Sequence, residues 1–221
     1  MIAAIVVAAG KGVRMGLALP KQFLPLKGIP LVCHSIRSLS FLVDRLILVL
    51  AEHDIPYCRD HVLVDLELPL PVELVAGGAQ RQESVFCGLS VLRPEDRWVV
   101  IHDGVRPFVP IKALQQCIQV ARKTGACIVG MPAIDTLKRV NDLGLIQGTL
   151  DREGIWQAQT PQVFRTELVM QAHRKARAEG YSGTDDASLV ERMGHPVSMV
   201  QGSRYNIKIT TPEDLRVAES I

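Results

Sequence analysis

Residues 2–16 read IAAIVVAAGKGVRMG, and this stretch decides the expected fold. Ile2–Val7 is a continuous apolar run of strand length, which is typical of a strand buried on both faces of a parallel sheet. The run passes directly into the glycine-rich residues 8–16. In an open parallel sheet such a turn lies at the carboxyl end of its strand, where these folds bind ligands. The stretch therefore predicts an α/β fold with a ligand site at this turn.

The chain after this turn continues to alternate between strand-like and helix-like segments. Alternation of this kind is typical of an α/β fold with a mostly parallel sheet flanked by helices. The expected strands are Arg45–Leu50, Val72–Val75, Trp98–Ile101 and Ala126–Met131, and the expected helices are Leu31–Leu39, Gln82–Leu92 and Ile111–Lys123.

The pattern changes after Pro132. Thr136–Val140 and Leu145–Leu150 have strand character, and residues 141–144 between them have the composition of a tight turn. We interpret residues 135–152 as a β-hairpin arm that projects from the main sheet. Because a lone two-stranded hairpin is marginally stable in water, we expect this arm to pack on a second subunit in a homodimer.

The last part of the chain returns to alternating elements after residues 159–164. Thr184-Asp185-Asp186 has the composition of an N-cap and acidic first turn. Thr211-Pro212 is typical of a capped helix start with proline at its first position. We expect residues 1–221 to form one domain, with helices at Thr166–Glu179, up to Met193 and after Thr211, and strands at Pro196–Val200 and Asn206–Thr210.

Length, charge and cysteine content exclude several classes of protein. The 221 residues carry 25 Lys and Arg against 23 Asp and Glu, a net charge of +2, which argues against a nucleic-acid binder. Apolar runs fall far below the ~20 residues of a membrane span, and the N-terminus lacks the basic region of a signal peptide. Five widely spaced cysteines without a CxxC favour a reducing cytoplasm over a disulfide framework.

The glycine-rich turn matches neither of two familiar phosphate-binding motifs. The dinucleotide motif GxGxxG requires glycine where Met15 stands, and the Gly-Lys-Ser/Thr of the P-loop is absent. The turn offers Lys11 and Arg14, with Lys21 seven residues further on, and three such cations can surround a triphosphate. Small residues also let backbone N–H groups approach a phosphate closely. The alternative is an ordinary strand–helix turn with solvated Lys and Arg side chains.

Two later segments place polar residues at the same edge of the predicted sheet. Residues 77–85, GGAQRQESV, open the helix after the third strand, where Gly78 permits close approach to a pyrimidine and Ser84 offers a hydroxyl. Residues 102–107, HDGVRP, end the fourth strand, where Asp103 can bind sugar hydroxyls or approach a metal ion. The alternatives are simple helix capping for Ser84 and satisfaction of nearby backbone N–H groups for Asp103.

These motifs together resemble nucleotidyltransferases that join a nucleoside triphosphate to a phosphorylated metabolite. The pattern Gly-x-Gly-x-Arg-Met followed by Pro-Lys matches residues 10–15 and 20–21. Gln22 beside Lys21 is similar to the cytidylyltransferases of isoprenoid precursor synthesis. Over about residues 2–218 the order and spacing of the motifs resemble the 2-C-methyl-D-erythritol 4-phosphate cytidylyltransferase family.

The resemblance implies a Rossmann-like nucleotidyltransferase fold whose hairpin arm reaches across a homodimer. The implied reaction joins CTP to 2-C-methyl-D-erythritol 4-phosphate in the non-mevalonate isoprenoid pathway and releases pyrophosphate. Mg²⁺ is expected on the CTP phosphates, with no metal site formed by protein side chains. The implied catalytic residues are Arg14, Lys21 and Lys208; the implied nucleotide-binding residues are Ala8, Ala9, Gly10, Lys11, Gly12, Gly77, Gly78, Arg81, Ser84 and Gly104; and the implied residues for the polyol phosphate are Asp103, Arg106, Thr136, Arg152, Thr160 and again Lys208.

Two positions depart from the family pattern. Gly104-Val105 stand where two alanines are common, and Ala79 stands where an acidic residue is common. The second departure leaves one contact to the base or ribose undecided, and neither departure changes a cationic residue.

Three other functions share part of the pattern. A cytidylyltransferase for another polyol phosphate, such as ribitol 5-phosphate, would share the fold and the CTP loop and differ near Thr136 and Arg152. A sugar-1-phosphate nucleotidyltransferase is disfavoured by Pro20-Lys21-Gln22 and by the hairpin. A nucleotide-binding regulatory protein without turnover would usually lose a cation of the glycine loop, whereas Arg14 and Lys21 are both present.

Overall fold

The computed structural model describes residues 1–10 and 19–221, and its centre is a seven-stranded sheet of order β11-β7-β10-β6-β1-β4-β5. Neighbouring strands are parallel except that β10 runs antiparallel to both β6 and β7. The mostly parallel α/β sheet is therefore confirmed. Its strands are β1 (Ile2–Val7), β4 (Arg45–Leu50), β5 (Val72–Ala76), β6 (Trp98–Asp103), β7 (Ala126–Pro132), β10 (Trp156–Arg165) and β11 (Ser198–Gln201).

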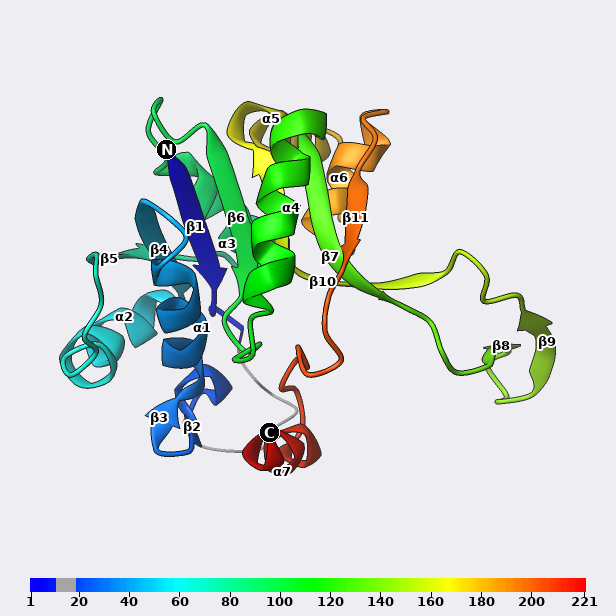
Figure 1. Cartoon of the computed structure of the whole chain (residues 1–221), viewed down its shortest axis with the longest axis horizontal. Helices are drawn as coiled ribbons and strands as arrows, with labels where there is room; N and C mark the ends of the chain where they lie inside the picture. The colour runs from blue at the N-terminus through cyan, green and yellow to red at the C-terminus, as the bar shows by residue number, and fades with distance from the viewer. Residues whose placement is uncertain (11–18) are drawn as a thin grey trace.

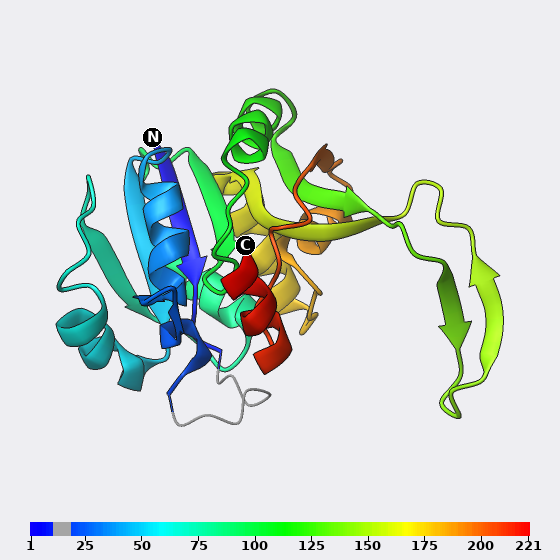
Figure 2. The same cartoon turned by 60° about the horizontal axis from the view of Figure 1, so that its bottom comes forward.

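Helices cover both faces of this sheet (Figure 1, Figure 2). Side chains along each strand alternate between two buried clusters, so that Val6 packs in one and Ile5 in the other. Burial on both faces explains why a central strand such as β1 is apolar throughout. The first face carries α1 (Leu31–Ser40) and α4 (Ile111–Thr124), and the second carries α3 (Arg81–Ser90), α5 (Thr166–Ala178) and α6 (Asp186–Arg192).

Several short elements were not predicted from the sequence. A helical run beside β4 consists of η3 (Glu52–Asp54), α2 (Ile55–Tyr57) and η4 (Cys58–Val62), and before α1 lie η2 (Lys21–Phe23), β2 (Pro25–Leu26) and β3 (Ile29–Pro30). Leu26 and Ile209 share a third buried cluster with Ala218 of the C-terminal helix α7 (Pro212–Ser220). This cluster fixes the segment that follows Lys21 to the segment that follows Lys208.

The strands β8 (Leu137–Val140) and β9 (Ile146–Leu150) pair as an antiparallel hairpin, separate from the main sheet. The Asn141 side chain closes its turn by accepting hydrogen bonds from the Leu143 and Leu145 backbone N–H groups at 3.1 and 2.9 Å. Figures 1 and 2 show the hairpin far from the sheet, at the end of the chain segments from β7 and into β10. Leu143 is 82% exposed and Ile146 65% exposed, so apolar surface of the hairpin is uncovered within one chain.

The predicted strand at Asn206–Thr210 is wrong, because these residues form no strand. Asn206 is buried, and its amide donates hydrogen bonds to the Thr160 carbonyl at 2.8 Å and to Gln159 Oε1 at 3.0 Å. The Ile209 N–H donates to the Val105 carbonyl at 2.9 Å. The hydrogen bonds of Asn206 and of the Ile209 N–H thus hold this segment near the end of β6, without the ladder of backbone hydrogen bonds that a strand would make.

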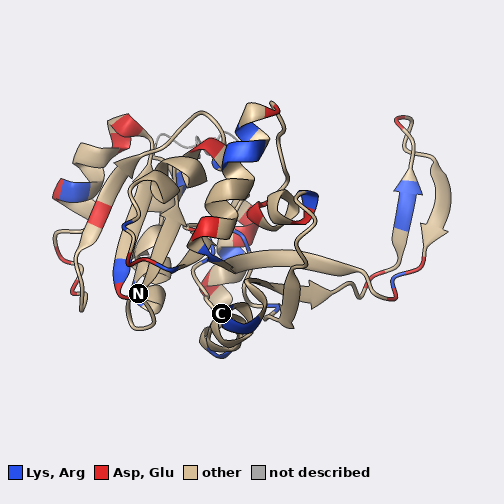
Figure 3. Ribbon diagram, turned by 90° about the horizontal axis from the view of Figure 1, so that it is seen from above, with Lys and Arg blue, Asp and Glu red and all other residues tan. Residues whose placement is uncertain are grey.

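Acidic and basic residues are interspersed over the molecule (Figure 3), in agreement with the nearly balanced charge. Within residues 1–10 and 19–221, no helix combines the length and apolarity needed to cross a membrane.

Gly88 of α3 packs directly on β1, so its replacement tests this helix–sheet contact. A Cβ at Gly88 would lie 2.7 Å from Ile5 Cγ2 and 3.1 Å from Val49 Cγ2. Alanine gains about 1 kcal/mol of helix propensity, whereas overpacking a buried contact costs roughly 1–3 kcal/mol. Because both contacting side chains are fully buried, we expect Gly88→Ala to lower the free energy of unfolding in urea.

The matched control for Gly88→Ala is Ser90→Ala, at an exposed position of the same helix. This variant is expected to stay within about 0.5 kcal/mol of the wild-type free energy of unfolding. Stabilisation by Gly88→Ala would contradict the packing described for α3.

Candidate active site

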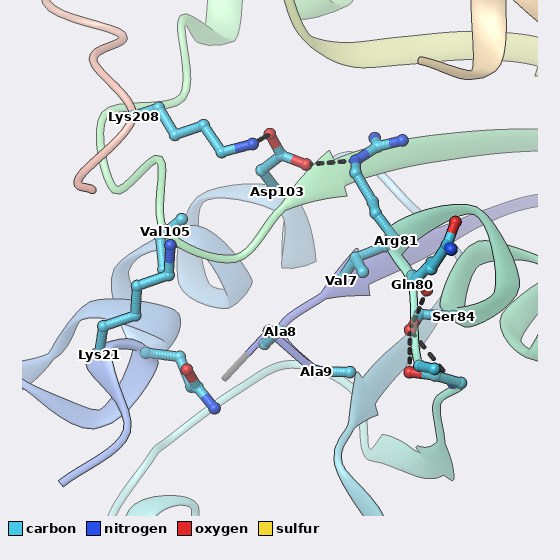
Figure 4. Close-up of a pocket in the computed structure, with 14 residues that line it drawn as sticks. Val7, Ala8, Ala9, Lys21, Gln80, Arg81, Ser84, Asp103, Val105 and Lys208 are labelled. Atoms are coloured by element: carbon cyan, nitrogen blue, oxygen red, sulfur yellow. Dashed lines mark hydrogen bonds and ion pairs between the residues drawn. The ribbon is translucent and has the colours of Figure 1, made fainter. Parts of the chain in front are cut away.

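A cavity lies at the carboxyl ends of β1 and β6 (Figure 4). Val7 and Asp103, the last residues of these two strands, are paired in register. The turn after β1 therefore lies beside the end of β6, at the edge where a parallel sheet binds ligands. The cavity is lined by Val7, Ala8, Ala9, Gly10, Lys21, Gln22, Gly78, Ala79, Gln80, Arg81, Ser84, Asp103, Val105 and Lys208.

The start of α3 forms one wall of the cavity. Gln80 and Glu83 make a capping box, and Glu83 Oε2 also accepts the Ala79 N–H at 2.8 Å. Ser84 Oγ accepts the Gly78 N–H at 3.2 Å and donates within the same turn. Ser84 therefore both lines the cavity and fixes the loop that precedes the helix. Ala79, which stands where the family often has an acidic residue, is held in place through the hydrogen bond from its backbone N–H to Glu83.

Gly77 and Gly104 support the cavity without lining it. A Cβ at Gly77 would lie 2.8 Å from Ala9 Cβ, and one at Gly104 would lie 3.0 Å from Ala8 Cβ. The Gly104 N–H donates to the Val7 carbonyl at 2.9 Å. Both glycines thus allow neighbouring segments to pack closely behind the Ala8-Ala9 turn.

Asp103 is a buried carboxylate that contacts three cationic side chains. Arg81 Nε donates to its Oδ1 at 2.9 Å, while Lys208 Nζ and Arg106 Nε lie 2.8 and 3.7 Å from its Oδ2. Burial alone would raise the pKa of this carboxyl, but Arg81, Lys208 and Arg106 outweigh burial and hold it well below its usual range. Asp103 is therefore ionised, and Figure 4 shows Arg81 and Lys208 reaching it from opposite sides.

A chain of hydrogen bonds behind Asp103 fixes the end of β6. His102 Nε2 lies 3.0 Å from the Arg106 carbonyl, which can only accept, so Nε2 carries the proton. His102 Nδ1 then accepts from the Thr160 hydroxyl at 3.1 Å, and Thr160 Oγ1 accepts the Asp103 N–H at 3.1 Å. Thr160, a predicted substrate residue, is buried behind Asp103 and does not line the cavity.

Arg81 also contacts a second buried carboxylate. Its Nη1 donates to Asp186 Oδ2 at 2.8 Å, and Asp186 Oδ1 lies 3.0 Å from His173 Nε2. The sequence pattern predicts for Asp186 only a place in the first turn of a helix, and it gives His173 no role. The doubled acidic pair was the available signal, because Asp185 alone caps α6 by accepting the Ser188 N–H at 2.9 Å.

The remaining predicted residues are distributed as follows. Lys21, in η2, lines the cavity. Its neighbour Gln22 is buried and lines the cavity too, although it is not among the predicted site residues. Thr136 and Arg152 are exposed at the base of the hairpin and do not line this cavity. The Arg152 guanidinium donates a hydrogen bond to the Ile134 carbonyl. The predicted residues Lys11, Gly12 and Arg14 lie outside the described residues.

The charged side chains that line the cavity favour an anionic ligand over a metal ion. Across the described part of the chain, no three His, Cys, Asp or Glu side chains gather as a metal-binding group. Both oxygens of Asp103 already face cationic side chains. The described residues therefore present ammonium and guanidinium groups that suit phosphates.

Comparisons with known proteins agree along nearly the whole chain. The family model for 2-C-methyl-D-erythritol 4-phosphate cytidylyltransferase matches residues 2–221. A protein of that name from Geotalea uraniireducens is 47% identical over 223 residues, covering 99% of this chain and 95% of the relative. The crystal structure of a 4-diphosphocytidyl-2C-methyl-D-erythritol synthase from Anaerococcus prevotii is similar with a TM-score of 0.86 and 32% identity, covering 99% and 94% of the two chains. A cytidylyltransferase structure from Thermus thermophilus gives a TM-score of 0.78 and 31% identity over 100% and 98%.

The state of His102 makes stability depend on pH. Burial lowers the pKa of His102 to about 4 from its ordinary 6.5. Between these values the unfolded chain binds a proton that the folded chain does not, so stability falls as the pH falls from 6.5 toward 4. At pH 5 this residue is expected to lower the free energy of unfolding by about 2 kcal/mol relative to pH 7.

The measurement is urea unfolding at pH 7 and pH 5, with His102→Gln as the comparison. Glutamine keeps a donor for Arg106 and an acceptor for Thr160, yet it does not titrate. The loss between the two pH values should be smaller in the variant by about the same 2 kcal/mol, and equal losses in both proteins would refute the assignment.

Proposed function

The chain belongs to the 2-C-methyl-D-erythritol 4-phosphate cytidylyltransferase family, and on that premise we propose how its residues carry out the reaction. The enzyme transfers the cytidylyl group of CTP to 2-C-methyl-D-erythritol 4-phosphate in isoprenoid synthesis. The products are 4-diphosphocytidyl-2-C-methyl-D-erythritol and pyrophosphate. The observation that supports the assignment of residues is the group of cations around Asp103 at the carboxyl edge of the sheet.

An oxygen of the substrate phosphate attacks the α-phosphorus of CTP in line. The new P–O bond forms as the bond from the α-phosphorus to the bridging oxygen breaks, and pyrophosphate leaves with the bonding electrons. Negative charge grows on the transferring group and on pyrophosphate, so the reaction needs positioning and fixed positive charge more than covalent chemistry. In this proposal Lys21 supplies a point charge and Arg14 a planar fork of donors.

CTP is proposed to occupy the cavity along the turn after β1 and the start of α3. Ala8 and Ala9 offer small side chains there, and Gly78, whose lack of a Cβ lets Glu83 pack against it, lines the cavity where the pyrimidine is proposed to lie. The proposed triphosphate ligands include the backbone of Gly10 and, in the segment outside the described residues, Lys11 and Gly12. Arg81 and Ser84 line the same cavity, while Gly77 and Gly104 are proposed to contribute by letting this wall pack closely.

The polyol phosphate is proposed to bind on the Lys208 side of Asp103. Lys208 is 38% exposed at its side chain, so its ammonium can face a phosphate while Asp103 orients it. Arg106 supports this side by donating to the Asn206 carbonyl at 2.6 Å, two residues before Lys208. Thr160 acts indirectly, through the backbone of Asp103.

Thr136 and Arg152 are proposed to complete the site of the other subunit in a homodimer. Both are exposed beside the hairpin and away from the cavity of their own chain. The exposed Leu143, Leu145 and Ile146 give the hairpin apolar surface for a second chain to cover. An arginine delivered in this way can bind the substrate phosphate through two parallel hydrogen bonds.

Mg²⁺ is proposed to enter with CTP, held by phosphate oxygens and water. Such a hard, small ion commonly keeps several waters and binds substrate phosphates. When bound, Mg²⁺ would neutralise part of the negative charge of the phosphates. Lys21 and Lys208 would supply positive charge from the protein.

The cytoplasm is the proposed compartment, and residues 1–221 are proposed to act as one domain. All five cysteines are free thiols in the structure, which suits a reducing environment. Nucleic acid and membranes are not proposed as partners.

Pyrophosphate release tests the function directly. CTP with 2-C-methyl-D-erythritol 4-phosphate is expected to give the highest kcat/KM in a panel that includes ribitol 5-phosphate and, as nucleotides, ATP, GTP and UTP. A higher kcat/KM with ribitol 5-phosphate would assign the chain to a related polyol phosphate. No release with any pair would refute turnover.

Lys21→Ala tests the proposed charge at the α-phosphate. Loss of one preorganised stabilising group typically costs roughly a hundredfold to a thousandfold in rate. We therefore expect kcat to fall at least about a hundredfold with the circular dichroism spectrum unchanged. Lys112→Ala, at an exposed lysine of α4, is the control, and near-normal turnover of Lys21→Ala would remove Lys21 from the mechanism.

Mixing two inactive variants tests whether the site is shared between subunits. Lys21→Ala damages the cavity, while Arg152→Ala damages the arm that is proposed to reach the partner. A mixed dimer then contains one site with both defects and one site with neither, so part of the activity should return. Activity no greater than the sum of the separate variants would contradict a shared site.

A further inference from the structure

The contacts of Arg81 extend from the cavity into the core between α5 and α6. Its guanidinium bridges two carboxylates, with Nε on Asp103 Oδ1 at 2.9 Å and Nη1 on Asp186 Oδ2 at 2.8 Å. Asp103 ends β6 and Asp186 begins α6. Two donors of one rigid plane thus contact acceptors from two separate elements, which defines both the place and the tilt of the guanidinium.

The third nitrogen of Arg81 has unsatisfied hydrogen-bonding capacity in the described part of the free chain. Nη2 is buried and has no hydrogen-bond partner among the described residues. Buried guanidinium nitrogens are normally satisfied in folded proteins, and Arg81 lines the cavity in which CTP is proposed to bind. The Arg81 side chain is 27% exposed, so part of it can meet a nucleotide in this cavity.

Asp186 is itself held on its far side. It is 1% exposed, and its Oδ1 accepts from Nε2 of His173, which is also 1% exposed. Burial alone would raise the pKa of the Asp186 carboxyl, but Arg81 and His173 outweigh burial and lower it, so the carboxylate is ionised. An ionised carboxylate only accepts hydrogen bonds, which assigns the proton to His173 Nε2.

The other cations around Asp103 explain why a second carboxylate is needed. Asp103 already faces Lys208 and Arg106 through Oδ2. Without Asp186, a single buried carboxylate would have to balance three cations, and Arg81 would keep only one of its two anchors. Repulsion from Arg106 and Lys208 would then act on a guanidinium that is free to turn about its remaining bond.

We propose that Asp186, supported by His173, is a positioning residue that holds the Arg81 guanidinium in the orientation that binds CTP. Asp186 is not among the residues that line the cavity, and it is hydrogen-bonded to one that is, Arg81. The inference rests on the proposed function, because it assigns CTP to the cavity that Arg81 lines.

A double-mutant cycle separates positioning from a structural role. Asp186→Asn keeps the size of the side chain and an oxygen that can accept from Arg81 but removes the charge. We expect a rise of about tenfold in KM for CTP, with kcat within about threefold, the scale of a lost hydrogen bond between charged groups. If Asp186 acts through Arg81, the same substitution in an Arg81→Ala background should change kcat/KM by less than about twofold.

The matched control is Asp185→Asn, the neighbouring acidic residue, which caps α6 and does not contact Arg81. Asparagine is as good an N-cap as aspartate, so kcat/KM should stay within about twofold of wild type. Calorimetric titration with CTP should give a dissociation constant about tenfold higher for Asp186→Asn and unchanged for Asp185→Asn.

If Asp186→Asn does not fold, His173→Leu tests the same network from its other end. It should raise KM for CTP about threefold, a smaller loss than that of Asp186→Asn, and it too should have no effect in the Arg81→Ala background. Equal losses in both backgrounds, or no loss with intact Arg81, would overturn the proposal. If the wild-type protein transfers the cytidylyl group but the losses in the two variants are additive, the proposed function stands and the role of Asp186 is refuted. If the wild-type protein shows no turnover, the proposed function is refuted, and the CTP titration remains as the test of Asp186.

Discussion

The buried carboxylate of Asp103 is the interaction on which the site depends. Arg81 from α3, Arg106 from the turn after β6, and Lys208 from an extended segment near the C-terminus all meet it. Without that negative charge, three cations at this distance would repel one another and turn toward solvent. With it, they stay at the carboxyl edge of the sheet, where each can face a phosphate. The proposed phosphate-binding site is thus arranged around an anion that belongs to the protein.

The fold secures this carboxylate from behind. β6 pairs with β1 as far as Asp103 and with β10 as far as Ile101, so strands on both sides hold the end of β6 in place. The chain from Asp103 N–H through Thr160 and His102 to the Arg106 carbonyl fixes the turn that follows. Asn206 then ties the Lys208 segment to β10. The neutral state of His102 follows from this burial, which disfavours the charged ring and lowers its pKa despite the hydrogen bond to the Arg106 carbonyl.

Periodicity predicts the sheet and its flanking helices because burial on both faces leaves a strong signal in strands such as Ile2–Val7. The same reasoning fails at Asn206–Thr210, where alternating residues suggest a strand and side-chain anchoring decides otherwise. Motif resemblance predicts site roles for Lys21, Arg81 and Lys208, since these residues lie in recognisable local patterns, and the structure brings all three to one cavity. It does not point to His173 or to the proposed role of Asp186, because the contacts among residues 81, 173 and 186 form only after folding. Partners that are distant along the chain leave no local pattern, so the sequence does not predict the hydrogen bond from the Asp103 N–H to Thr160 Oγ1.

The ionisation of Asp103 in the free protein is the most direct test of this account. Carbon-13 NMR of the side-chain carboxyl, assigned by comparison with Asp103→Asn, can follow its titration over the pH range in which circular dichroism shows the protein folded. An ordinary aspartate is half protonated near pH 3.9. The account predicts no change in the Asp103 carboxyl signal from pH 7 down to about pH 4, because three cations hold the charge. An inflection at or above pH 3.9 would show that the cations do not gather around this carboxylate, and the central claim would be wrong.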